Sequence, residues 1–451
     1  MTQRCATCRT ANPDEARYCL ACGRPLGRPA PSWERPPSRR VVITGVGAIS
    51  PVGLTAEESW QALLAGRSGT RLAEHIPNIE RYPNRVVGEI RGFDPLAYIS
   101  RKEARRMTES SQFAVAAATM AVQDAGLRLE DEDRTRVGVI LGTAIGGGII
   151  ETERAMRRLL GGQRISPITF TAVWPNIAAY HVARTFGLTG YNATIVTACA
   201  SGTQALGEAA EAILRGDVDV VLAGGAEACD SEIAIASYTA TGVLSKRNDA
   251  PERACRPFDA DRDGMVPGEG AAVLILERLD HALARGARIY AEVLGWAGTS
   301  DANHITAPTA RWQALAMQRA LASAGLGPED VDYINAHATS TPLGDIVETE
   351  AIKMALGERA YDIPVSATKS MTGHMLGAAG AFEAVVCVLT LRDQRIHPTA
   401  NYETPDPQCD LDYVPNRARE ARVDVTLSNS FGFGGQNACI LLGRWRNELG
   451  V

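Results

Sequence analysis

The chain has 451 residues, of which 45% are hydrophobic and 22% charged, and it carries 43 glycines and 23 prolines. This composition excludes a disordered or collagen-like chain, and the length suits about three domains of ~150 residues or one long α/β domain. Apolar runs fall far short of the ~20 residues that a membrane helix needs, and the N-terminus lacks a signal-peptide pattern, so we expect a cytoplasmic protein without membrane contact.

The formal net charge is −6, but the charge is unevenly distributed along the chain. Residues 1–40 contain eight arginines and three acidic residues, whereas residues 41–451 carry an excess of acidic residues. The large body of the protein therefore lacks the charge of a polyanion-binding protein. An acidic partner needs a local basic patch.

The N-terminus predicts a small zinc ribbon over residues 1–23. Two Cys-x-x-Cys motifs lie ten residues apart, which is enough chain to fold back and close one tetrahedral shell. Few apolar residues surround them, so metal binding has to supply most of the folding free energy. Disulfides or redox-active pairs are the alternative, and the ribbon could serve nucleic-acid binding or protein docking. The expected zinc ligands are Cys5, Cys8, Cys19 and Cys22.

A linker over residues 24–40 follows, because its prolines favour extended backbone. From residue 41 on, short β-branched runs alternate with alanine-rich helical patterns, which predicts an α/β fold. Strands are expected at 41–47, 137–141, 194–197, 219–222 and 272–276, and helices at 111–125 and 202–214.

A second series of strands repeats this order and is expected at 291–295, 331–335, 365–367 and 438–441. The sequence therefore predicts a duplicated unit, with an N-terminal half at 41–285 and a C-terminal half at 286–451. The clearest internal sequence similarity is between two strand-to-helix junctions that are rich in small residues, 195–207 and 365–377. The first junction carries a thiol and the second an imidazole.

Cys199 follows a predicted strand, where a helix N-terminus places backbone N–H groups and partial positive charge near the sulfur. Such a position lowers the pKa of a thiol and is typical of a nucleophile. A small buried core cysteine is the alternative. The other five cysteines beyond residue 41 show no pairing pattern, which fits reduced thiols.

Two of the seven histidines also lie in turns after predicted strands, His337 within residues 335–341 and His374 within residues 369–374. Their spacing is weak evidence for a metal site, whereas Cys with His is typical of covalent acyl chemistry. The glycine-rich stretch 429–435 is expected to form a mobile loop whose N–H groups approach a substrate oxygen. It enters a strand, which argues against a nucleotide-binding loop.

These motifs together resemble the elongating β-ketoacyl-acyl-carrier-protein synthases, the decarboxylating condensing enzymes of the thiolase fold. The resemblance implies an α/β, duplicated, five-layered α-β-α-β-α architecture and a homodimer. It also implies that catalysis needs no metal or organic cofactor, so that zinc would be structural. The matching segments run in order through residues 41–51, 142–147, 197–202, 223–227, 256–259, 262–264, 268–270, 335–345, 368–380 and 428–437.

The resemblance also implies roles for the residues of the site. Cys199 accepts the acyl chain as a thioester, while His337 and His374 hydrogen-bond the malonyl thioester carbonyl as carbon dioxide leaves. The enolate then attacks the acyl-cysteine carbonyl, and the backbone N–H groups of Cys199 and Phe431 hold the oxyanion.

Further residues are assigned by the same resemblance. Lys369 is expected to orient His374 together with Glu383, and its charge disfavours an imidazolium beside it. Phe431 is expected to gate access to Cys199. The implied substrate-binding residues are Thr339, Thr341, Ile145, Tyr238, Gly432 and Phe433.

The implied partner is an acyl carrier protein in its acyl and malonyl forms. Lys102, Arg105 and Arg106 match the basic residues that receive the carrier in this family, and helical spacing puts Lys102 and Arg106 on one face. An ordinary solvated helix face is the alternative. Nucleic acid as a partner is supported only by the zinc motif.

The expected function is decarboxylative Claisen condensation with malonyl-acyl carrier protein, giving 3-oxoacyl-acyl carrier protein in fatty acid elongation. Ala338 where glycine is usual, Gln436 where threonine is common, and the short stretch 306–312 leave a specialised polyketide-type ketosynthase as the alternative. A thiolase would need a second catalytic cysteine, for which Cys439 is the candidate and fits a core strand instead. A non-catalytic chain-length factor would lack Cys199.

Overall fold

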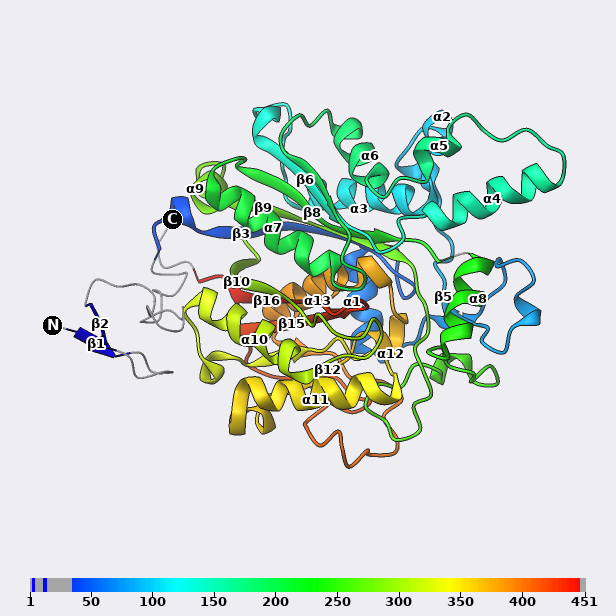
Figure 1. Cartoon of the computed structure of the whole chain (residues 1–451). Coiled ribbons are helices and arrows are strands. Elements are labelled where there is room, and N and C mark those ends of the chain that lie inside the picture. Colours follow the sequence, from blue (N-terminus) through cyan, green and yellow to red (C-terminus); the bar gives the residue numbers. More distant parts are fainter. Residues whose placement is uncertain (1, 5–10, 14–34, 230, 447–451) are drawn as a thin grey trace.

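The computed structural model describes residues 2–4, 11–13, 35–229 and 231–446. Most of these residues form an α/β body in which strands and helices alternate along the chain (Figure 1). The predicted strands of the N-terminal half are present as β3 (Val41–Ile49), β6 (Val137–Gly142), β7 (Asn192–Ile195), β8 (Val220–Glu227) and β9 (Gly270–Arg278), and the predicted helices as α3 (Glu109–Asp124) and α7 (Ser201–Arg215).

The C-terminal half repeats this set of elements. Its strands are β10 (Ala291–Ser300), β11 (Tyr333–Asn335), β12 (Val365–Ser366), β15 (Val425–Gly432) and β16 (Gln436–Arg444). Its long helices are α10 (Ala310–Ala324), α11 (Pro342–Leu356) and α13 (Ala379–Asp393), and the short elements α12 (Lys369–Thr372) and η9 (Leu376–Ala378) precede α13.

The ten main strands follow the order β12-β11-β15-β16-β10-β3-β9-β8-β6-β7. Each half therefore has the same internal order, with β3 corresponding to β10 and β7 to β12. In each half the pairs nearest the outer edge are parallel and the others antiparallel. The duplication is thus visible in the topology, and β3 and β10 join the halves into one mixed sheet through three residue pairs.

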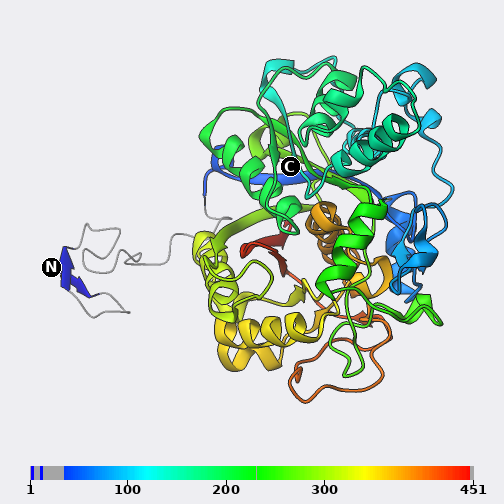
Figure 2. The ribbon, with the colours of Figure 1, turned by 45° about the vertical axis from the view of Figure 1, so that its right-hand side comes forward.

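The helices lie in layers around this sheet (Figures 1 and 2). Helix α3 packs on β3, β8 and β9, and α10 packs on β10 and β16 with α11 beside it. Helices α7 and α13 contact each other and strands from both halves, so they lie between the two halves of the sheet. The resulting order is helix, sheet, helix, sheet, helix.

The two central helices meet through reciprocal glycine contacts. A Cβ on Gly202 would lie 2.7 Å from the backbone nitrogen of Ala381, and one on Gly380 would lie 2.1 Å from the Thr203 hydroxyl. This contact pairs Gly202 with Gly380. The second junction therefore extends past the predicted range 365–377, because α12 and η9 precede α13.

The remaining elements surround this core. The other helices are α1 (Ala56–Leu64), α2 (Arg101–Ala104), α4 (Gly148–Leu160), α5 (Thr169–Ala172), α6 (Ile177–Phe186), α8 (Glu232–Thr241) and α9 (Leu279–Ala284). The other strands are β1 (Thr2–Arg4), β2 (Ala11–Pro13), β4 (Thr70–Leu72), β5 (Val86–Gly88), β13 (Arg395–Ile396) and β14 (Arg419–Glu420).

Two local predictions were wrong. The helical spacing expected to put Lys102 and Arg106 on one face extends over the single turn α2 only, because Arg105 already ends the helix. The expected mobile loop at 429–435 is mostly strand, since β15 runs to Gly432 and pairs in register with β16 up to Gln436. Small side chains there serve close packing in a sheet, and the turn itself is short.

The N-terminal strands β1 and β2 pair antiparallel, with Gln3 opposite Asn12. The cysteines of the predicted zinc ribbon, Cys5, Cys8, Cys19 and Cys22, lie outside the described residues. Among the described residues, no helix has both the length and the apolar character to span a membrane.

Candidate active site

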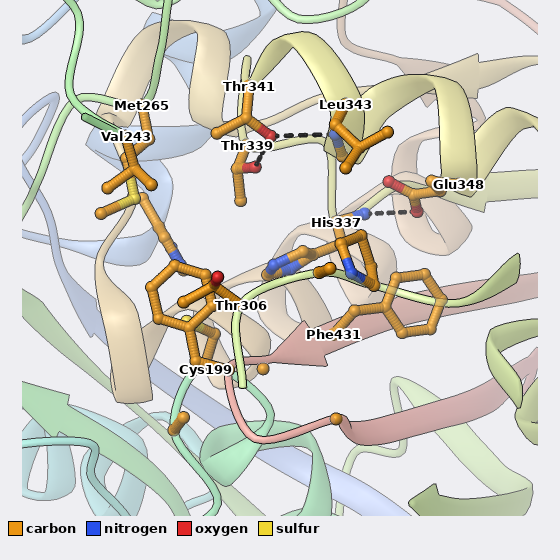
Figure 3. A pocket seen from close by; sticks show the side chains of 18 of the residues that line it. Cys199, Val243, Met265, Thr306, His337, Thr339, Thr341, Leu343, Glu348 and Phe431 are labelled. Carbon is orange, nitrogen blue, oxygen red and sulfur yellow. Dashed lines mark hydrogen bonds between the residues drawn. The ribbon is translucent and has the colours of Figure 1, made fainter. Parts of the chain in front are cut away.

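A cavity of about 330 Å³ lies where the two halves meet, and its walls come from both of them (Figure 3). The three expected catalytic side chains Cys199, His337 and His374 all line it, together with Phe431. Residues 306–308 of the short stretch also line it, before α10 begins at Ala310. Of the expected substrate-binding residues, Tyr238, Thr339, Thr341, Gly432 and Phe433 line the cavity, whereas Ala144 lines it in place of Ile145.

Cys199 sits in a sharp turn between β7 and α7. Ala198 has a φ of 50°, a left-handed conformation that side chains other than glycine rarely adopt. The Ser201 hydroxyl donates to the Ala198 carbonyl at 2.6 Å and accepts from the Thr197 N–H at 2.8 Å, which holds the turn closed. A Cβ on Gly432 would lie 3.0 Å from the Cys199 nitrogen, so the end of β15 passes directly over this turn.

The expected lowering of the Cys199 pKa was wrong. Burial raises the pKa of the thiol to about 11, and the positive charge of Lys369 and the Phe433 backbone N–H only partly oppose this effect. Helix α7 begins two residues later, at Ser201, and desolvation is the largest effect on the pKa of the thiol. The thiol is therefore protonated at neutral pH in the free protein.

His337 is held by a carboxylate that the sequence analysis missed. Glu348 of α11 accepts hydrogen bonds from the backbone N–H groups of His337 at 2.8 Å and Ala338 at 2.6 Å (Figure 3). Ala338 and Ser340 have φ values of 36° and 67°, so the turn after β11 is tightly coiled. Glu348 is spaced in the sequence like an ordinary helix residue, and only its burial in the structure reveals that it holds the His337 turn.

His374 follows Gly373, whose φ of 67° turns the chain into the cavity. Its backbone N–H donates to Val266 at 2.7 Å and its carbonyl accepts from the Gly268 N–H at 2.8 Å. The segment leading into β9 therefore fixes the backbone of His374. Gly268 belongs to the segment 268–270, one of the segments that match the family, so this segment supports the backbone of His374.

The two imidazoles face each other edge to face, with ring centroids 5.3 Å apart, and the Phe431 ring lies 5.8 Å from that of His337. Within the described residues, Nδ1 of His337 and both ring nitrogens of His374 have no hydrogen-bond partner. Burial and the charge of Lys369 hold the pKa of each imidazole well below its usual range. Both rings are therefore neutral at pH 7 and free to donate to a substrate oxygen.

Lys369 and Glu383 form a buried ion pair beside the histidines, with 2.5 Å between Nζ and Oε1. Each side chain is 1% exposed. Burial raises the pKa of Glu383 to about 7 against the opposing effect of Lys369. No hydrogen bond joins Lys369 to His374 in the described part of the chain, so Lys369 acts on His374 through its charge.

Cys199, His337 and His374 offer ligand atoms that all lie within 4.8 Å of one another. Zn²⁺ binds thiolate sulfur at about 2.3 Å and imidazole nitrogen at about 2.0–2.1 Å, so the atom types alone would suit it. The nearby Lys369 cation and the protonated thiol both oppose a cation here. The arrangement better suits a thioester carbonyl placed between the sulfur and the two imidazoles.

A second carboxylate missed by the sequence analysis supports the opposite wall. Glu227, at the end of β8, accepts from the backbone N–H groups of Ala144 at 2.6 Å, Gly146 at 2.7 Å and Gly377 at 3.1 Å. It also accepts a hydrogen bond from the backbone N–H of Ile145 at 3.1 Å. Glu227 therefore joins the two halves beside the cavity.

The motifs at 256–259 and 262–264 lie behind the His337 turn. Asp345 accepts from the backbone N–H groups of Ser340 at 3.1 Å and Phe258 at 2.8 Å. Arg262 donates to the carbonyls of Thr341 at 3.1 Å and Pro342 at 2.7 Å. These charged residues brace the turn from outside the cavity.

The expected carrier-docking residues lie away from the catalytic cavity. Lys102, Arg105 and Arg106 are all exposed at the surface. Arg105 and Arg106 line a second hollow of about 350 Å³ between α2 and α4, together with Arg154 and Arg158. The structure therefore gathers arginines from two segments on this face.

Comparison with known proteins gives consistent matches. The 3-oxoacyl-[acyl-carrier-protein] synthase 2 of Coxiella burnetii is 45% identical over 410 residues, which cover 90% of this chain and 99% of that protein. The protein of the same name from Staphylococcus aureus is 46% identical over 409 residues, covering 90% of this chain and 98% of that protein.

A β-ketoacyl synthase from Burkholderia phymatum has a solved structure that is 38% identical, with a TM-score of 0.84, and covers 90% of this chain and all of that chain. A type II polyketide ketosynthase solved with its acyl-carrier protein is also 38% identical, with a TM-score of 0.83 and the same coverage. Residues 38–282 match the N-terminal domain of β-ketoacyl synthases, and residues 290–403 match the C-terminal domain. The chain therefore belongs to the β-ketoacyl synthase family.

Proposed function

We propose that this chain is an acyltransferase that condenses an acyl group on Cys199 with malonyl-acyl carrier protein, with loss of carbon dioxide, to give 3-oxoacyl-acyl carrier protein in fatty acid elongation. The observation that carries the proposal is the convergence of one thiol and two neutral imidazoles on a single cavity. The named relatives at 45–46% identity support the substrate class.

In the first half-reaction, the Cys199 sulfur attacks the carbonyl of the acyl thioester. The new C–S bond forms as the carrier's C–S bond breaks, and the thiol proton of Cys199 goes to the departing carrier thiol. We propose that the backbone N–H groups of Cys199 and Phe433, which both reach the Cys199 sulfur, hold the oxyanion in place of the expected Phe431. Because the pKa of Cys199 is about 11, we propose that the proton leaves during attack and not before it.

In the second half-reaction, the malonyl thioester oxygen accepts hydrogen bonds from His337 and His374. The bond to the carboxylate breaks, carbon dioxide departs, and its electron pair forms an enolate that these N–H groups stabilise. The enolate carbon attacks the acyl carbonyl and Cys199 leaves as thiolate, which regains a proton from solvent. Neutral imidazoles suit this role because they donate without needing to titrate.

Fatty acid elongation is favoured over a specialised polyketide pathway by the relatives. Those named 3-oxoacyl-[acyl-carrier-protein] synthase 2 reach 45–46% identity, whereas the polyketide ketosynthase solved with its carrier protein is 38% identical. Purified full-length chain, acyl carrier protein loaded with a saturated acyl chain, and malonyl carrier should yield one two-carbon extension, detected by mass spectrometry. No condensation with any saturated acyl carrier would reject the proposal, and repeated extension without reduction would favour the polyketide alternative.

Carrier docking at Lys102, Arg105 and Arg106 is part of this proposal. Arg158 of α4 adds positive charge to the same face, which suits an acidic carrier, whereas Arg154 is paired with Glu109 and Glu151. Charge reversal in Lys102→Glu/Arg106→Glu should raise KM for carrier-bound substrate and flatten its salt dependence, with little change in kcat. Arg417→Glu, a reversal elsewhere on the surface, is the control. Unchanged KM across a salt series would exclude this face.

A homodimer is supported by the outer edge of the sheet. Among the described strands, β7 pairs with β6 only. The apolar side chains that flank β7 in the chain, Tyr191 and Val196, are 48% and 52% exposed, as expected where a second subunit covers them. Sedimentation should give a dimer, and Val196→Glu should shift it toward monomer while Tyr361→Glu does not. A monomeric wild-type chain would contradict this proposal.

We keep the zinc ribbon at residues 1–23, the linker at 24–40 and the halves at 41–285 and 286–451 as proposals. Four cysteine thiolates suit one structural Zn²⁺. Metal analysis should find one zinc per full-length chain and none after all four N-terminal cysteines are changed to serine. Equal zinc content in both proteins would place the metal elsewhere.

A further inference from the structure

Five polar side chains are buried together beneath the turns that carry His337 and Lys369. None of them lines the catalytic cavity. They come from β11, from β12 and the junction after it, and from the segment after β13. The five are Tyr333, Asn335, Ser366 and His397, which have no exposed surface, and Thr368, which is 1% exposed.

The hydrogen bonds of His397 define its tautomer. Its Nδ1 atom lies 2.9 Å from the carbonyl oxygen of Pro398. A carbonyl only accepts, so Nδ1 carries the proton and Nε2 is left as an acceptor. Burial lowers the pKa of this imidazole to about 4, so the ring is neutral under ordinary conditions.

The Nε2 atom faces donors from two separate segments. The Thr368 hydroxyl lies 3.1 Å away, the Tyr333 and Ser366 hydroxyls both lie 3.2 Å away, and the Asn335 amide nitrogen lies 3.4 Å away. The Asn335 amide donates to the Thr368 oxygen at 2.9 Å, which leaves the Thr368 proton for Nε2. A directed chain of hydrogen bonds therefore runs from Asn335 through Thr368 to His397.

This chain joins the two catalytic turns. Asn335 ends β11, two residues before His337, and Thr368 directly precedes Lys369. The residues after His397 run beside the turn that carries Lys369. There, Thr399 Oγ1 accepts a hydrogen bond from the Ala367 N–H at 3.1 Å. The imidazole thus contacts side chains on both sides of the gap between the two turns.

We propose that His397, as the neutral Nδ1–H tautomer, is a positioning residue that holds the turn carrying His337 against the turn carrying Lys369 and His374. A rigid ring with a donor on one edge and an acceptor on the other spans the gap without adding charge beside Lys369. The role rests on the proposed function. Decarboxylation depends on both turns, whereas acylation of Cys199 does not.

Two substitutions of similar size distinguish the roles of the Nδ1 and Nε2 edges of the His397 ring. Gln at position 397 can place an oxygen where Nε2 lies, whereas Asn reaches only the Pro398 side. His397→Asn should lower kcat for carbon dioxide release about 10- to 100-fold, the loss expected from a small misplacement of catalytic groups. KM for malonyl carrier and the rate of Cys199 acylation should stay within about 2-fold, and His397→Gln should restore most of kcat.

Thr368 supplies the matched control. Thr368→Val removes the hydroxyl at nearly constant shape and should reproduce the kcat defect, whereas Thr368→Ser keeps it and should not. In the His397→Asn background, Thr368→Val should cause no further loss, because both changes break one chain of bonds. Equal losses in acylation and decarboxylation, or additive effects of the two changes, would overturn the proposal and leave His397 as a packing residue.

A spectroscopic arm does not depend on activity. With ¹⁵N-labelled histidine, the seven imidazoles of the full chain can be assigned by single His→Gln changes. His397 should show the Nδ1–H tautomer, and His397→Asn should shift the His337 and His374 ring signals while His397→Gln should not. An Nε2–H tautomer would reject the proposal. A wild-type chain that releases no carbon dioxide would reject the proposed function, and the tautomer would still decide the role of His397.

Discussion

The two strand-to-helix junctions that meet at the cavity share a backbone plan and differ in length. Residues 196–200 join β7 to α7, and Cys199 stands two residues before the helix begins. Residues 367–378 join β12 to α13, and this longer junction includes α12 and η9. The duplication gives two equivalent strand-to-helix junctions. The additional residues of the second junction include Lys369 and His374.

The two junctions also differ in what burial does to their reactive groups. Burial raises the pKa of the Cys199 thiol to about 11 and lowers the pKa of His374 far below its usual value. Both groups are therefore neutral at pH 7. The thiol of the first junction has to lose its proton to react, whereas the imidazole of the second junction donates a hydrogen bond without changing its protonation state.

Removing the Cys199 thiol should have the largest effect on the chemistry of the first junction. Cys199→Ser should lower the rate of acyl-enzyme formation by at least about 1,000-fold, because a buried hydroxyl is a much poorer nucleophile. Intact-mass analysis after incubation with acyl carrier reports the adduct. Cys439→Ala, a change in the core of β16, should still form it. An adduct on Cys439 in the serine variant would favour thiolase chemistry.

Removing one imidazole tests the second junction and its partner turn. His337→Ala should lower carbon dioxide release about 100- to 1,000-fold, since one of two donors to the developing enolate is lost. Acylation of Cys199 should fall less than about 5-fold. Release of labelled carbon dioxide from malonyl carrier measures the first quantity. A larger loss in acylation than in decarboxylation would reverse the assignment of the two turns.

The pH dependence of the two junctions should differ in the wild-type chain. Alkylation of Cys199 by iodoacetamide should rise about tenfold per pH unit from pH 7 to 9, because its pKa of about 11 keeps the thiolate fraction small there. Carbon dioxide release should stay nearly constant from pH 6 to 8, because both imidazoles remain neutral. A plateau in alkylation by pH 8 would mean that the helix dipole lowers the thiol pKa after all.

The helix contact between the junctions predicts a stability effect. Gly380→Ala should destabilise the fold by about 2 kcal/mol, because the new methyl group would overlap the Thr203 hydroxyl. Urea unfolding measures this loss. Gly161→Ala, at the exposed end of α4, meets no atom closer than 3.3 Å and should be nearly neutral. Equal stability of both variants would show that α7 and α13 separate readily.

The smallest expected effect lies at Ala338. Its φ of 36° costs an alanine about 1 kcal/mol more than a glycine, although glycine also loses more entropy on folding. Ala338→Gly should therefore change stability by less than about 1 kcal/mol and leave kcat within about 2-fold. Thermal unfolding and the condensation assay test both. A large loss of kcat would mean that the Ala338 methyl group itself shapes the site.

Much of the site could be predicted because strands and their following turns leave a local pattern. The predicted strands before Cys199 and His337 correspond to β7, which lies two residues earlier, and to β11, which starts two residues later and ends where expected. The glycine before His374 marks a turn that the structure contains. The meeting of these turns could be inferred only from the family resemblance, because no local signal brings residues 199 and 374 together.

What could not be predicted depends on depth in the fold. Glu227 and Glu348 have no special spacing, yet burial turns each into an acceptor for several backbone N–H groups. The Cys199 pKa was wrong for the same reason, since the helix dipole is visible in the sequence and desolvation is not. The length of the second junction was missed because its extra chain, which forms α12 and η9, resembles the start of a helix in the sequence.

The central claim is that the two junctions carry separate half-reactions. The most direct measurement compares Cys199→Ala with His374→Ala, recording the acyl-enzyme by intact mass and carbon dioxide release from malonyl carrier in the same samples. We predict that Cys199→Ala forms no acyl-enzyme but still releases carbon dioxide, and that His374→Ala forms the acyl-enzyme but releases almost none. Loss of both half-reactions in both folded variants would contradict the division of labour between the junctions.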